Sequence, residues 1–121
     1  MPRKLLIRPK MEMPSTATGR FGGIFVMIKE DNGEMRPLPH IPFSKRNGSP
    51  MFHSPDGFGI GYAGSGPSDL AIAICHLFNK PKLANEFKFQ VIAKLDRNKD
   101  YDIPLIHIEA LLERIASGKP V

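Results

Sequence analysis

A run of glycines leading into a helical pattern is the feature that most constrains this sequence. Residues 59–74 read GIGYAGSGPSDLAIAI, with four glycines ahead of Pro67 and an apolar run behind it. Proline suits the first position of a helix, where its missing N–H leaves no hydrogen bond unmade. We therefore predict that a helix begins at Pro67, with Ser65 or Gly66 as its cap. Pro81 should end this helix.

The residues before this stretch are typical of a β-rich segment. Residues 4–8 are predicted to form a first strand, and residues 23–30 a second. Asn32-Gly33 is a strong hairpin signal after the second strand, because both turn positions need a backbone that tolerates positive φ. The prolines among residues 34–39 confine the third strand to an edge of the sheet or make it short.

The remainder of this half is less regular. Residues 11–20 and 40–50 are predicted to be loops because they are polar and rich in proline, glycine and serine. Residues 51–53 and 58–62 are predicted to pair as two short strands around the turn sequence at residues 54–57.

Two more helices are predicted in the second half. Apolar residues recur every four positions over residues 83–95, although Phe87, Phe89 and Val91 also alternate as in a strand. A third helix should start at Pro104 and carry an apolar stripe along one face. Strands followed by helices predict an α+β fold, in which a small antiparallel sheet from the N-terminal half is packed by about three C-terminal helices.

The length of 121 residues suits one domain. We divide the chain into a strand and basic N-terminal loop over residues 1–20, a single α+β domain over residues 21–116, and a tail over residues 117–121.

Composition limits the compartment and the partners. The net charge of +5 mildly favours a phosphate-bearing or acidic partner, since most of the cations are scattered. Cys75 is the single cysteine, which excludes an internal disulfide and suits a reducing compartment. Because no apolar stretch approaches the ~20 residues that span a bilayer, we expect a cytoplasmic protein without membrane contact.

The glycine spacing matches the dinucleotide-binding motif, but the secondary structure predicted around it does not. Gly59, Gly61 and Gly64 have the spacing of that motif, which requires a buried strand before it and a helix that starts within it. Here the preceding segment contains Pro55, and the helix is predicted to begin only at Pro67. A Rossmann nucleotide site is therefore not expected.

Metal sites are not expected either. Residues 96–102 resemble the start of a calcium loop, but Tyr101 and His107 stand where an EF-hand needs glycine and glutamate. We interpret these residues as a polar linker between helices. The four histidines do not have the spacing of a zinc site; they are His40, His53, His76 and His107.

No residue pair defines a reaction. Cys75 and His76 are adjacent, but a cysteine inside an apolar helix is usually a buried structural thiol. We lean towards a non-enzymatic protein without a cofactor, and the sequence leaves an enzyme open.

The predicted helix start is the best candidate for a binding site. Backbone N–H groups in a glycine-rich turn and the positive end of a helix dipole together bind phosphate or carboxylate groups. Two hydroxyls and an aromatic ring that suits stacking on a base lie nearby. Alternatively, the carboxylate of Asp69 caps the turn itself. The candidate ligand-binding residues are Tyr62, Gly64, Ser65, Gly66, Ser68 and Asp69.

The run Gly57 to Ala71, GFGIGYAGSGPSDLA, resembles the signature of a small domain-of-unknown-function family found in phage and prokaryotic genomes. Its motif reads approximately G-F-x-W-G-Y-G-G-S-G-P-A-D-L-A, and this sequence departs from it at Ile60, Ala63 and Ser68. Weaker similarity extends over roughly residues 21–115. The resemblance implies no established activity, but its phage setting suggests an accessory role or one that counters host defence.

Three functions follow as hypotheses. The first is a non-enzymatic binding protein, of the phage origin that the resemblance suggests, which holds a phosphate-bearing small molecule such as a nucleotide at the helix start. The second is a protein-interaction inhibitor of a host complex such as a defence system, with the GSGP motif purely structural. The third is weak nucleic-acid binding through scattered lysines and arginines, which a steep dependence on salt would reveal. If a phage encodes the protein, its location is the host cytoplasm. The sequence leaves open whether the protein forms a homo-oligomer.

Overall fold

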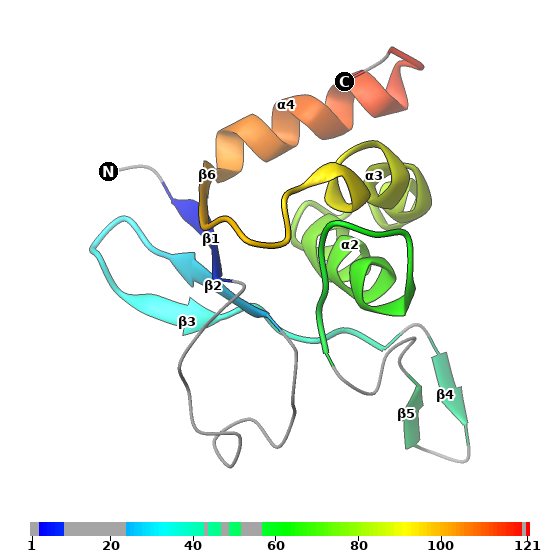
Figure 1. Ribbon diagram of the computed structural model, residues 1–121, viewed down its shortest axis with the longest axis horizontal. Helices are drawn as coiled ribbons and strands as arrows, with labels where there is room; N and C mark the ends of the chain where they lie inside the picture. Colours follow the sequence, from blue (N-terminus) through cyan, green and yellow to red (C-terminus); the bar gives the residue numbers. More distant parts are fainter. Residues whose placement is uncertain (1–2, 9–23, 43, 47–48, 52–56, 120) are drawn as a thin grey trace.

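Helices cover one side of an antiparallel sheet in this protein (Figure 1). The computed structural model describes residues 3–8, 24–42, 44–46, 49–51, 57–119 and 121. The predicted α+β fold is confirmed, with the sheet strands mainly early in the chain and the helices after them. The predicted loop at residues 11–20 lies outside the described residues.

The sheet has the strand order β3-β2-β1-β6. Strand β1 (Lys4–Arg8) pairs antiparallel with both β2 (Phe25–Lys29) and β6 (Tyr101–Pro104). Strand β3 (Met35–Pro37) lies at the edge beside β2, as its prolines predicted. The first two predicted strands and the hairpin turn between residues 30 and 34 are therefore confirmed, and Gly33 adopts a φ of 88° in that turn.

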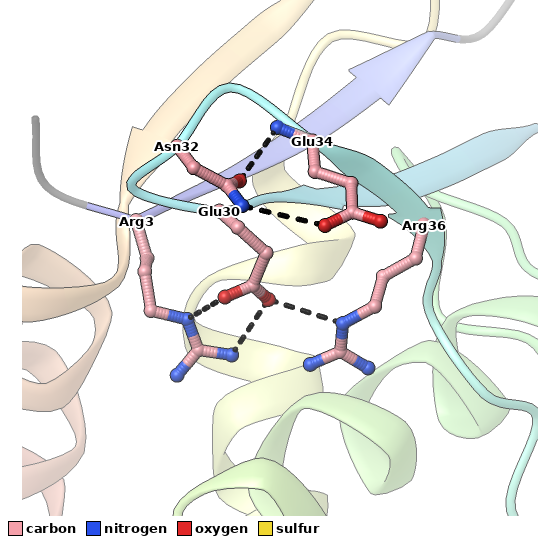
Figure 2. Close-up of polar contacts among 5 residues, drawn as sticks. All are labelled: Arg3, Glu30, Asn32, Glu34 and Arg36. Carbon is pink, nitrogen blue, oxygen red and sulfur yellow. Dashed lines mark hydrogen bonds and ion pairs between the residues drawn. The ribbon is translucent and has the colours of Figure 1, made fainter.

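Polar contacts hold the ends of the first three strands together (Figure 2). Arg3 Nη2 donates to Glu30 Oε1 at 3.2 Å, and Arg36 Nε donates to the same oxygen at 3.0 Å. The Arg3 Nε lies 3.1 Å from Glu30 Oε2, which is an ion-pair contact rather than a directed hydrogen bond. In the adjoining turn, Asn32 Oδ1 accepts from the backbone N–H of Glu34 at 2.9 Å.

Two predictions about strands are wrong. Residues 40–50 are not simply a loop, because β4 (Ser44–Arg46) pairs with β5 (Ser49–Met51) in a separate hairpin. Residues 58–62 form no strand and run as an irregular segment into the first helix. The turn expected at residues 54–57 falls almost entirely outside the described residues.

The helices begin with α2 (Ser65–Leu77), which starts two residues before Pro67 and has Gly64 as its N-cap. The predicted helix at residues 83–95 is shorter and interrupted. It consists of the 3-10 turn η1 (Pro81–Leu83), α3 (Ala84–Gln90) and the 3-10 turn η2 (Ile92–Lys94). Helix α4 (Leu105–Ala116) follows Pro104 as predicted. None of the helices among the described residues is long and apolar enough to cross a membrane.

The core lies between the sheet and the helices. Leu5, Ile7 and Ile28 supply it from the central strands, and all three are fully buried. The helices contribute Leu70 and Ile74 from α2, and they also bury Phe87, Ile108 and Leu112 from α3 and α4. Burial of this apolar surface holds α2 in place; in its first turn Ser65 is exposed, whereas Gly66 and Pro67 are buried.

The polar linker predicted at residues 96–102 is only partly correct, because Tyr101 and Asp102 belong to β6. This strand pairs with β1 from almost a hundred residues earlier and leads directly into α4. The alternation of apolar and polar residues in β6 is too short to predict a strand from the sequence. The strand forms because it can pair with the edge of β1.

Candidate functional site

The glycine-rich turn before α2 packs around the side chain of Tyr62. A Cβ atom on Gly59 would lie 2.8 Å from the Tyr62 hydroxyl oxygen, and one on Gly66 would lie 2.9 Å from it. A Cβ on Gly64 would overlap the edge of the ring. Glycine is needed at these positions because any side chain would displace the tyrosine. The tyrosine itself is 44% exposed, so part of its ring faces solvent beside the turn.

Arg97 brings a positive charge to the same ring. Its guanidinium carbon lies 5.3 Å from the centre of the Tyr62 ring, within the range of a cation–π interaction. The backbone fixes this neighbourhood, because the N–H of Gly61 donates to the carbonyl of Ile92 at 3.1 Å. The turn before α2 is thereby tied to the segment that follows α3.

Lys88 of α3 reaches the first turn of α2. Its ammonium donates to the Ser68 hydroxyl at 3.1 Å, and that hydroxyl donates to the carbonyl of Gly64 at 3.1 Å. The Ser68 hydroxyl is thus used in both directions, as an acceptor from Lys88 and as a donor to the backbone. Its role is to place the ammonium at the helix start rather than to offer its own proton to a ligand.

The start of α2 is electropositive. A helix N-terminus carries about half a positive charge on its unbonded N–H groups. The first turn of α2 contains no acidic residue, and Lys88 adds a full charge beside it. Pro67 has no N–H and the N–H of Ser68 bonds to Gly64, so Ser65 and Gly66 supply the backbone donors of this turn.

Asp69 points into the protein instead of towards solvent. The residue is fully buried, and its Oδ2 lies 3.0 Å from Nε2 of His40. The His40 ring also packs against Phe58, with ring centres 5.0 Å apart. The N-cap of α2 is Gly64, which has no side chain to close the turn. The Asp69 carboxylate therefore holds the chain after β3 against α2.

Five of the six predicted site residues lie together. Tyr62 and the turn residues Gly64, Ser65, Gly66 and Ser68 surround the start of α2, while Asp69 is directed inward to His40. Sequence reasoning missed His40, Lys88 and Arg97. A carboxylate within an apolar helix does signal that a buried partner exists, but it does not say which residue that is. No comparable signal marks Lys88 or Arg97.

Other candidate groups are buried or have structural partners. Burial raises the pKa of the Cys75 thiol to about 12, so the neutral thiol is the form present at physiological pH. Arg8 forms ion pairs with Asp102 at 2.7 Å and with Asp100 at 3.9 Å, which puts a cation where a calcium ion would need to bind. Within the described part of the chain, no group of three or more potential ligands is arranged to hold a metal ion.

A family model described as "Family of unknown function (DUF6166)" matches residues 20–114, which is well over half of the chain. The chain belongs to the DUF6166 family. The expected membership of a family of unknown function is thereby confirmed. The matched residues contain the whole candidate site of this DUF6166 protein, from Tyr62 to Arg97, but not β1, the strand between β2 and β6. No curated protein and no solved structure matches the chain.

Proposed function

We propose that this DUF6166 protein is a non-enzymatic binding protein that holds a phosphate-bearing small molecule, such as a nucleotide, at the start of α2. The contact between Lys88 and Ser68 is the observation that carries the proposal. It brings an ammonium next to the positive end of a helix whose first turn has no acidic residue. Positive charges collected in this way repel one another, and a bound phosphate relieves that repulsion.

Each residue of the site has a distinct part in this proposal. The backbone N–H and the hydroxyl of the exposed Ser65 donate to phosphate oxygens, and the buried Gly66 lets the turn pack against Tyr62. Lys88 forms the ion pair with the phosphate, and Ser68 holds Lys88 in position. The exposed part of Tyr62 stacks on the base or packs on the sugar, with Arg97 beside it. The carboxylate of Asp69 contacts His40 inside the protein, so it does not occupy the place of the phosphate at the start of α2.

Calorimetric titration with inorganic phosphate and with AMP tests the proposal. Replacing Lys88 by glutamine removes a charge-assisted hydrogen bond worth about 1.5–3 kcal/mol. We therefore expect AMP affinity to fall by at least about tenfold. Lys99→Gln is the matched control, since Lys99 is an exposed lysine after η2 whose loss removes the same charge. Ser65→Ala should weaken binding by a smaller factor.

The outcomes separate a specific site from general attraction. Equal losses in Lys88→Gln and Lys99→Gln would mean that AMP senses only net charge, and the proposal would fail. Absence of heat and of thermal stabilisation with phosphate, AMP and a broader set of nucleotides would also overturn it. Retained secondary structure by circular dichroism is required of each variant.

The second candidate is the protein-interaction inhibitor, in keeping with the phage setting that the motif suggests and with a place in the host cytoplasm. Phe89 favours it, because this side chain is 47% exposed directly beside Lys88. Phenylalanine is among the residues that are enriched in protein interfaces relative to the rest of the surface. If a host complex copurifies, is released by Phe89→Ala and is retained by Ser65→Ala, the inhibitor is supported over the nucleotide-binding protein.

A further inference from the structure

A hollow lies at the end of α2 opposite to the candidate site, about 20 Å along the helix from its start. It has a volume of about 340 Å³ and is lined by Asn79, Lys80, Pro81, Lys82, Leu83 and Ala116. That volume is within the range of small-molecule sites, which begins near 300 Å³. None of its lining residues belongs to the candidate site at the start of α2.

The hollow is built by the way α2 ends. The N–H of Lys80 donates to the carbonyl of Cys75 at 2.9 Å, and the N–H of Asn79 donates to the carbonyl of His76 at 3.1 Å. Asn79 adopts a φ of 55°, which reverses the chain. The turn η1 follows at once and contacts both α2 and α4. Consequently Pro81 and Leu83 are brought opposite Ala116 at the end of α4.

Apolar and cationic groups share this hollow. Pro81, Leu83 and Ala116 give it apolar walls, and the cationic residues Lys80 and Lys82 also line it. Neither lysine has an ion-pair partner among the described residues. A helix C-terminus favours nearby cations, which accounts for the positive charge but not for the apolar walls. A ligand that carries both an apolar chain and a negative charge matches the two features together.

We propose that this hollow binds a small apolar carboxylic acid, with its chain between η1 and the end of α4 and its carboxylate between Lys80 and Lys82. Allowing for the share of volume that a water occupies in the liquid, the space holds roughly ten non-hydrogen atoms. A medium-chain carboxylate is of that size. The site is independent of phosphate binding at the other end of α2, so the two ligands should not compete.

Amide chemical-shift mapping of the full chain with octanoate tests this proposal. Saturable shifts are expected for the amides of residues 79, 80, 82, 83 and 116. Octanol has the same chain without the charge, and acetate has the charge without the chain. Both should bind at least about fivefold more weakly than octanoate, because each makes only one of the two kinds of contact.

Two variants check the same contacts from the side of the protein. Lys80→Gln with Lys82→Gln should lower octanoate affinity by about fivefold or more, as expected for two exposed ion pairs, whereas Lys94→Gln in η2 should leave it unchanged. Ala116→Phe should fill the hollow and abolish the shifts.

Three results would each overturn the proposal. They are the absence of saturable shifts in residues 79, 80, 82 and 83 at millimolar octanoate, equal affinity for octanol, and unchanged affinity in the double lysine variant. The lysine variants keep the proposal testable even where Ala116→Phe alters the end of α4. Competition by AMP would also contradict the independence of the two sites.

Discussion

Nε2 of His40 lies 3.0 Å from Oδ2 of Asp69, and this contact joins the chain after β3 to the first half of α2. Asp69 is fully buried, and the His40 side chain is 16% exposed. The pair is therefore largely removed from water. It supports the turn before α2 from inside the protein, while Tyr62 and Lys88 surround that turn at the surface.

Breaking this pair should strongly destabilise the protein. Removing one partner of a buried polar pair leaves the other without its bond, at a cost of about 3–5 kcal/mol when the pair is charged. We expect Asp69→Ala and His40→Ala each to lower the free energy of unfolding in urea by about 3 kcal/mol. Asp102→Ala is the control, because its side chain is 54% exposed and its ion pair with Arg8 is partly open to solvent. A loss below about 0.5 kcal/mol in both variants would contradict the role of the pair.

Gly61 should be far less replaceable than Gly33, although both residues have positive φ. A Cβ at Gly61 would overlap Cγ of Arg97 and lie 2.9 Å from the carbonyl oxygen of Leu95, whereas one at Gly33 meets nothing within 4 Å. Gly33→Ala should therefore cost only the backbone strain of about 1–2 kcal/mol. Gly61→Ala should exceed that loss by about 1–3 kcal/mol in urea unfolding. Similar losses of unfolding free energy in the two variants would contradict this prediction, because they would mean that the segment around Arg97 shifts to accommodate the methyl group at little cost.

The thiol of Cys75 should resist alkylation in the folded protein. Its pKa is raised by burial from 9.0 to about 12, and the residue has no exposed surface. A group whose pKa is higher when folded favours folding below its unfolded value and loses that contribution as pH rises towards the folded value. Stability should thus decline between about pH 9 and pH 12, and less so in Cys75→Ala. Iodoacetamide labelling near pH 8 should be slow without urea and rapid in urea; rapid labelling without urea would contradict the burial.

Glu30 should contribute to stability in a way that acid removes. Its pKa is lowered from the ordinary value of 4.5, chiefly by the hydrogen bond from Arg36 and further by the contact with Arg3. A lowered pKa favours folding above the unfolded value, and this contribution is lost as pH falls through the folded value. The stability of the wild type should therefore decrease below about pH 4.5, and Glu30→Gln should show a weaker decrease. Glu34→Gln, on an exposed residue of the same turn, serves as the control. The same decrease in all three proteins would assign the acid sensitivity to other groups.

Local signals in the sequence predicted much of the fold. The hairpin at Asn32-Gly33 and the helix that follows the glycine-rich turn are confirmed, because the backbone conformations there depend on residues next to one another. The edge position of β3 is also confirmed, since Pro37 lacks a donor wherever the strand is placed. Five of the six candidate site residues lie together for the same reason, because they follow one another along a single turn.

Only the tertiary structure decided the rest. Strand β6 forms by pairing with the edge of β1. A segment of four residues is too short for its alternation to predict a strand from the sequence. His40 meets Asp69 across 29 positions of the chain, and Lys88 meets Ser68 across 20. Such contacts depend on how the helices pack against the sheet, and packing follows apolar burial over the whole domain rather than any local pattern. The sequence by itself therefore determined the turn that starts α2, and the folded chain decided that its aspartate faces inward and that a lysine from α3 lies beside it.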